Sequence, residues 1–119
     1  MRTSQDPRHK KRQSTIQELF SLGFHNQTVS SETKEIINHK LLIDDKIQQA
    51  APNFPVDKIN KIDLAILRLA LYELLIKKKE PKNVIIDEAV ELAKEFGSDT
   101  SPGFVNGVLG HILTYAKFA

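Results

Sequence analysis

The stretch KIDLAILRLALYELLIKK at residues 61–78 decides the fold of this chain. Hydrophobic side chains occupy positions on nearly every side of the helix that this stretch would form. A helix that is apolar all round is buried by neighbours on several of its faces. We therefore predict a central helix from about residue 60 to residue 78. Three lysines at 77–79 suit its C-terminal end, and Pro81 bars its continuation.

Helical spacing of apolar residues continues on both sides of this segment, and no strand pattern competes with it. Capping residues, glycines and prolines mark the ends of the segments. The predicted segments are a helix that begins at Asp6-Pro7, a helix from Ser30 to Ala50, a short turn at 56–59, the central helix, a helix at about 84–96 and a final helix that begins at Ser101-Pro102. The predicted fold class is therefore all-α, a single helical bundle.

The composition is typical of a soluble globular protein with one domain. The chain has 119 residues, of which 40% are hydrophobic and 27% are charged. No apolar run reaches the roughly 20 residues that a membrane-spanning helix needs, and the polar N-terminus is unlike a secretory signal. Because the chain has no cysteine, it has neither a disulfide framework nor a thiolate metal site. A cytoplasmic location fits these features.

Positive charge is concentrated at the N-terminus. Residues 1–12 hold five basic residues and one acid, a net charge of +4; since the whole chain carries +2, the remainder carries −2. A basic arm on a mildly acidic body is a typical electrostatic footprint for nucleic acid, although a solvated tail would have the same composition. The helix dipole disfavours cations in a first turn, which is a further hint that these side chains face a partner. The basic residues are Arg2, Arg8, Lys10, Lys11 and Arg12.

No pattern for catalysis or metal binding is found. The four histidines do not combine at helical spacing into a set typical of metal ligands. The acids at residues 87–95 are interpreted as the solvated face of a helix. The serines lie in no nucleophile elbow, and the glycines form no phosphate-binding loop. The sequence therefore predicts a protein without enzymatic activity, metal or cofactor. The histidines concerned are His9, His25, His39 and His111.

The C-terminal half resembles the NusB family of transcription antitermination factors. KIDLAILRLALYELL (61–75) is similar to the family's central helix, with its Ala-x-Leu-Arg-x-Ala-Leu-Tyr-Glu core. VIIDEAVELAKEFG (84–97) and SPGFVNGVL (101–109) match the next two helices in the same order. The first helix is a looser match, a basic cluster followed by IQELF. The resemblance implies the family fold, two small helical bundles packed together, over a single NusB-like domain at 1–119 with a basic arm at 1–12.

The resemblance also implies a function. Members of the family bind the boxA segment of RNA as a heterodimer with NusE, which is also a protein of the small ribosomal subunit. Their complex joins RNA polymerase and suppresses premature termination. For this chain the implied partners are therefore boxA-type RNA, NusE and the RNA polymerase antitermination complex, in the transcription of ribosomal RNA.

By the same resemblance, the first helix supplies RNA-binding residues. Arg8, Lys10, Lys11 and Arg12 stand where the family has its arginine-rich segment, and would contact phosphates in a salt-dependent way. Phe20 falls at an aromatic position near that surface. It either stacks on a base or packs under the first helix.

The resemblance carries over four further positions. Thr100, Ser101 and Phe104 match the loop and helix start that the family brings to the RNA, where backbone N–H groups suit phosphate. Phe104 either stacks on an unpaired base or belongs to the core. Asp63 matches an acidic position that contacts NusE. It could equally be an acid that stabilises the first turn of its helix.

Three residues are expected to have structural roles. Gly107 is expected to permit close helix packing, because a glycine inside a helix otherwise costs roughly 1 kcal/mol relative to alanine. Asn106 is expected to hydrogen-bond a neighbouring helix end. Arg68, which interrupts the central apolar helix, is expected to pair with an acid or a carbonyl group, because an unpaired buried charge is costly.

The chain departs from the family pattern at several positions. The segment before Ser30 is short, so one helix of typical members is missing and the N-terminal bundle is predicted to be reduced. Gly103 replaces a frequent lysine or arginine, and Phe20 lacks a tyrosine hydroxyl. We therefore expect RNA binding that is weaker but still sensitive to salt. Uncovered apolar surface could also pair two copies of the chain as a homodimer.

Two alternatives stay open. The first is a protein-only helical adaptor that binds NusE but has lost RNA recognition; Gly103 and the missing helix favour it, and the basic arm opposes it. The second is an enzyme fragment, because a NusB-like domain precedes the catalytic domain of certain ribosomal RNA cytosine methyltransferases. No nucleotide-binding fold follows the last predicted helix, so methyl transfer is not expected of this chain.

Overall fold

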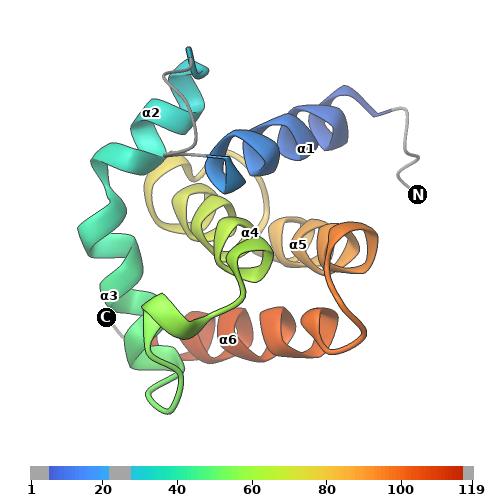
Figure 1. Cartoon of the computed structure of the whole chain (residues 1–119). Coiled ribbons are helices and arrows are strands. Elements are labelled where there is room, and N and C mark those ends of the chain that lie inside the picture. The colour runs from blue at the N-terminus through green and yellow to red at the C-terminus, as the bar shows by residue number, and fades with distance from the viewer. Residues whose placement is uncertain (1–5, 22–27, 117–119) are drawn as a thin grey trace.

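The computed structural model describes residues 6–21 and 28–116, with side chains through Thr114, and its regular elements there are all helical (Figure 1). The all-α prediction is confirmed. Arg2, Phe24 and His25 lie outside the described residues. Within the described ranges, no helix combines the length and the apolar character that crossing a membrane requires. The elements are α1 (Pro7–Phe20), α2 (Ser31–Asn38), α3 (Lys40–Ala50), the 3-10 turn η1 (Val56–Lys58), α4 (Lys61–Leu71), the π-helical segment η2 (Tyr72–Lys77), α5 (Lys82–Phe96) and α6 (Ser101–Ala116).

The predicted central helix is α4, which packs against α1, α3, α5 and α6. It lies in the middle of the molecule in Figure 1. Its start is capped by Asn60, whose Oδ1 accepts hydrogen bonds from the N–H groups of Ile62 (2.9 Å) and Asp63 (3.4 Å). The helix does not continue regularly to residue 78, because the chain widens into η2 and stops at Lys78 in the left-handed conformation (φ 54°). Apolar side chains around α4 are at most 3% exposed: Ala65, Ile66, Leu67, Leu69, Ala70 and Leu71.

The helix expected from Ser30 to Ala50 is in fact two helices, α2 and α3, separated at His39. The backbone of His39 leaves the helical region (φ −104°, ψ 13°), and its ring Nδ1 lies 2.8 Å from the carbonyl oxygen of Glu35. The break allows α2 to pack on α1, while α3 turns to pack on α4 and α6. Ile43 and Ile47 of α3 thereby become fully buried. The single-helix prediction was wrong because no glycine or proline marks this break.

Arg68 confirms the expectation of an ion pair across the bundle. Its Nε and Nη2 donate to the two carboxylate oxygens of Asp44 in α3, at 2.9 and 2.8 Å. Two parallel hydrogen bonds of this kind fix geometry as well as neutralise charge. The pair therefore fastens α3 to α4 where the apolar surface of α4 is interrupted.

The two expectations for Gly107 and Asn106 were wrong. A Cβ atom at Gly107 would meet no heavy atom within 4 Å, so this glycine does not serve close helix packing. Asn106 is exposed, and no hydrogen bond of its side chain is found among the described residues. Close packing occurs instead at Gly97, where a Cβ would lie 2.4 Å from Oγ of Ser101. Gly97 thus lets the end of α5 meet the start of α6.

Candidate nucleic-acid interface

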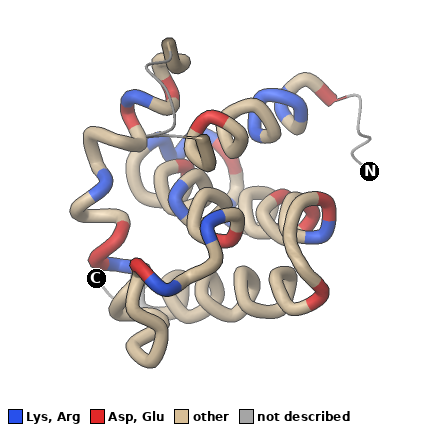
Figure 2. The backbone as a smooth tube through the Cα atoms, viewed as in Figure 1, with Lys and Arg blue, Asp and Glu red and all other residues tan. Residues whose placement is uncertain are grey.

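The basic residues of α1 divide into an exposed and a buried group. The helix begins where Asp6 caps it, with Oδ1 accepting the N–H of Arg8 at 2.8 Å. Arg8, Lys10 and Lys11 are exposed, whereas Arg12 is only 5% exposed. The tube of α1 in Figure 2 carries this basic cluster beside the N-terminal end of the chain. Three of the four predicted phosphate-binding cations are therefore accessible.

The accessible cations make only loose contacts. Arg8 approaches Asp6 (3.2 Å) and Glu80 (3.8 Å), and Lys11 lies 3.3 Å from Glu32. The carboxylate side chains of these pairs are only 18%, 21% and 9% exposed. The side chains of Arg8 and Lys11 are 65% and 60% exposed, so these cations remain accessible to a phosphate.

Arg12 is the centre of a buried ion cluster. Its Nε and Nη2 donate to the two oxygens of Glu73 at 2.9 and 2.7 Å, its Nη1 donates to Glu88 at 3.0 Å, and Nη2 also contacts Glu80. Burial opposes the charge of Arg12, but the hydrogen bonds and attraction of Glu73, with the charges of Glu80 and Glu88, raise its pKa above the ordinary value. The structure places Arg12 in this cluster rather than at the surface, and we leave it out of the RNA-binding surface proposed below.

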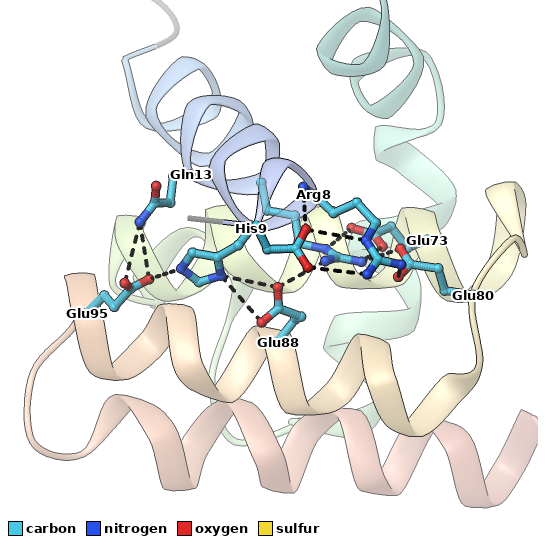
Figure 3. Close-up of polar contacts among 9 residues, drawn as sticks. Arg8, His9, Gln13, Glu73, Glu80, Glu88 and Glu95 are labelled. Atoms are coloured by element: carbon cyan, nitrogen blue, oxygen red, sulfur yellow. Dashed lines mark hydrogen bonds and ion pairs between the residues drawn. The ribbon is translucent and has the colours of Figure 1, made fainter. Parts of the chain in front are cut away.

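His9 extends the cluster along α5 (Figure 3). Its Nδ1 lies 3.1 Å from Glu88, and its Nε2 lies 2.8 Å from Glu95. Because carboxylates only accept hydrogen bonds, both ring nitrogens must donate, which requires the protonated imidazolium. Burial lowers the pKa of His9, but the hydrogen bond and charge of Glu88, together with Glu95, outweigh it, so the pKa is raised. His9 and Arg12 thus fasten α1 to α5 by charge.

The cluster contradicts one interpretation of the sequence. Glu88 was assigned to a solvated face, but it is only 2% exposed. Its position, one turn from Ile85 and one turn from Leu92, places it on the apolar face of α5. This position of Glu88 on the apolar face could have indicated its burial from the sequence. The position of Glu73, inside the apolar stretch that forms α4 and η2, could have indicated the same for Glu73. The cations in the first turns of α1 are therefore neutralised largely by acids of other elements.

The raised pKa of His9 predicts that stability depends on pH. A group whose pKa is higher in the folded state stabilises that state fully below its unfolded value, near about 6.5, and loses this contribution as the pH rises through the folded value. We expect the difference in unfolding free energy between the wild type and His9→Gln to shrink as the pH is raised from about 6 to about 9. Urea denaturation at several pH values measures it. His39→Gln is the control, and an equal pH dependence in both variants would contradict the prediction.

The start of α6 holds the second group of predicted RNA-binding residues. Thr100 is exposed, Ser101 is fully buried and Phe104 is half-buried. Oγ of Ser101 accepts the N–H of Ser98 at 3.0 Å, so its side chain belongs to the turn between α5 and α6. Figure 3 shows α5 between α1 and α6. The helix that carries the basic cluster and the helix α6 therefore lie on opposite sides of α5 (Figure 3).

The remaining predicted residues lie apart from these groups. Phe20, the last residue of α1, is 40% exposed. Asp63 lies in the first turn of α4 and is 7% exposed, yet its Oδ1 finds no hydrogen-bond partner among the described residues. A buried carboxylate oxygen without a donor is costly, and this one could be satisfied by a donor from a partner. Within the same part of the chain, no group of three or more histidine, aspartate or glutamate residues is arranged to hold a metal ion.

Sequence comparison relates the chain to the NusB family. The model described as the NusB family matches residues 3–114. The transcription antitermination protein NusB of Chloroflexus aggregans is 43% identical over 109 residues, which cover 83% of this chain and 73% of that protein. NusB of Roseiflexus castenholzii is 54% identical over 78 residues, which cover 64% of this chain and 55% of that protein. The second match thus spans little more than half of the relative's length.

Comparison of structures agrees with the sequences. T. maritima NusB superposes with a TM-score of 0.78 and 31% identity over 99% of each chain. A chain from the crystal structure of antitermination factors NusB and NusE in complex with double-stranded RNA has the same fold, with a TM-score of 0.76 and 19% identity over 92% of this chain and 98% of that one. Because the family pattern extends from residue 3 to residue 114, and a NusB structure matches along the whole fold, this chain belongs to the NusB family.

Proposed function

We propose that this chain is an antitermination factor that binds boxA-type RNA together with NusE, and that it acts by binding alone, without catalysis. The observation that carries the proposal is family membership combined with the accessible cations of α1. Relatives are named transcription antitermination proteins, and a chain of the same fold was crystallised with NusE and double-stranded RNA.

The proposed RNA surface has two parts. Arg8, Lys10 and Lys11 supply exposed positive charge at the start of α1, where they can contact phosphates. Thr100 and Phe104 supply a polar and an aromatic side chain at the start of α6. Phosphate contacts position an RNA, whereas contacts to bases select its sequence. We therefore assign affinity mainly to α1 and sequence preference mainly to α6.

The proposed NusE contact is Asp63. The support for this contact is the acidic family position that Asp63 matches, together with a buried Oδ1 that finds no donor among the described residues. Asp63 lies in the first turn of α4, on a different helix from the cations of α1.

Salt dependence tests the proposed role of α1. Replacing Arg8, Lys10 and Lys11 together with alanine should flatten the plot of log affinity for RNA against log salt concentration. Each lost phosphate contact reduces the slope by roughly 0.7–0.9, so the expected reduction is roughly 2–3. Fluorescence anisotropy with labelled boxA RNA, in the presence of NusE, measures the slope.

A matched variant controls for the loss of three charges. Lys34, Lys40 and Lys79 are exposed residues outside the proposed surface, and their joint replacement with alanine removes the same net charge. This control should keep most of the wild-type slope. Equal slopes for the two triple variants would show that the cations of α1 have no specific part in RNA binding.

A further inference from the structure

Phe54 is a large apolar side chain held at the surface by a rigid loop. It is 54% exposed. The side chain of Gln48 clamps this loop, because its Nε2 donates to the carbonyl oxygens of Ala51 (3.2 Å) and Phe54 (3.1 Å), while its Oε1 accepts the N–H of Val56 (3.1 Å). The loop backbone that carries the exposed ring is thus held by the side chain of Gln48.

Phe54 lies against Phe104, an aromatic residue already placed in the proposed RNA surface. The ring centroids are 5.4 Å apart, and the ring planes make an angle of 68°, an edge-to-face arrangement. Beside this pair is a hollow of about 280 Å³ between α6 and the loop. Gly103 and Gly107 line the α6 side, and Asn53 supplies an amide on the loop side. We call this feature the Phe54 hollow.

The two glycines have no packing role that explains them. A Cβ atom at Gly103 or at Gly107 would meet no heavy atom within 4 Å. Glycine is disfavoured inside a helix relative to alanine, and neither residue has a left-handed backbone that would call for glycine. Bare backbone facing an open hollow permits the close approach of a ligand.

We propose that the Phe54 hollow binds one unpaired base of the RNA, with the base stacked on Phe54 and the sugar-phosphate chain passing close to Gly103 and Gly107. This inference rests on the proposed function and adds Phe54, Gly107 and Asn53 to its site. An aromatic face suits any base, and a side-chain amide suits the edge of one. The volume of the hollow lies just below roughly 300 Å³, the lower end of the range for small-molecule sites. A hollow of this size suits a single base better than a helix of a partner protein.

The first test fills the hollow without threatening the fold. Gly107→Leu places a good helix former at a position with open space around it, so the variant should fold. It should bind boxA RNA with about 5- to 150-fold lower affinity in the presence of NusE, the range expected when one base loses its stacking. Gly110→Leu is the matched control, because Gly110 is also an open position on α6 but does not line the hollow. It should bind RNA as the wild type does.

A second variant and modified RNAs identify the occupant. Phe54→Ala should weaken RNA binding by a similar factor, and Phe54→Ala combined with Gly107→Leu should weaken it little further, because both changes remove the same contact. In a series of boxA RNAs with one abasic position each, one of the positions that weaken wild-type binding should leave the binding of Gly107→Leu unaffected.

Each other outcome overturns the inference in a recognisable way. If the wild type binds boxA RNA and both variants bind it equally well, the hollow takes no base and the proposed function stands. If Gly107→Leu weakens the binding of NusE, measured by calorimetry, but not the binding of RNA alone, the hollow is a protein contact. If the wild type itself binds no RNA, the inference falls together with the proposed function.

Discussion

Replacing Arg12 with alanine is expected to lower the free energy of unfolding by about 3–5 kcal/mol, the usual cost of removing one partner of a buried ion pair. Glu73 and Glu88 have side chains that are 5% and 3% exposed, and both would lose the hydrogen bonds that Arg12 donates. Because domains of this size are stable by only about 5–15 kcal/mol, the loss is a large fraction of the total. Urea denaturation followed by circular dichroism measures it.

Two further variants separate the roles of charge and of geometry at this position. Arg8→Ala removes a guanidinium from the same helix whose side chain is 65% exposed, so it should change stability little. Arg12→Lys keeps the charge but cannot form the two parallel bonds to Glu73, and should give an intermediate stability. If Arg12→Ala were no more destabilising than Arg8→Ala, the ion cluster would not be what holds α1 to η2 and α5.

Replacing Asp63 with asparagine is expected to weaken the binding of NusE by about 30-fold or more, which corresponds to the roughly 2–5 kcal/mol lost when one member of a buried charged pair is removed. The fold should change little, because Oδ1 of Asp63 has no hydrogen-bond partner among the described residues and the asparagine has nearly the same shape. Two small effects oppose each other: loss of a favourable charge near the start of α4, and relief of a buried charge.

Calorimetry with purified NusE measures this change. Asp57→Asn, a change at an exposed acid in η1, is the matched control and should leave NusE affinity unaltered. If Asp63→Asn bound NusE as tightly as the wild type does, Asp63 would not be the NusE contact. A fall in RNA affinity measured without NusE would instead place Asp63 in the RNA surface.

Local rules allowed much of the fold to be predicted from the sequence. Asp6 caps α1 and Gly97 ends α5, as the spacing of these residues predicts. The central position of α4 followed from apolar residues on all its faces. That Arg68 has a partner followed from the cost of burying a charge, although the identity of Asp44 did not. These features depend on neighbours along the chain or on one strong energetic requirement.

The features that sequence analysis missed depend on contacts between distant segments. His39 breaks a helix without a glycine or proline, because packing on α1 and packing on α4 and α6 demand different directions. Glu88 and Arg12 are 76 positions apart. The sequence around either residue does not indicate that the two form an ion pair. The sequence indicates the exposure of Phe54 only weakly, because this apolar residue lies between Pro52 and Pro55 and outside any helical stripe. Its contact with Phe104 could not be predicted without the fold.

The most direct measurement is the affinity for boxA RNA and for a scrambled RNA of equal length and composition, each with and without purified NusE, by fluorescence anisotropy. The proposed function predicts tighter binding of boxA than of the scrambled RNA, with the preference increased by NusE. Stable binding of NusE combined with equal affinity for the two RNAs would contradict it, and would leave a helical adaptor that binds protein alone.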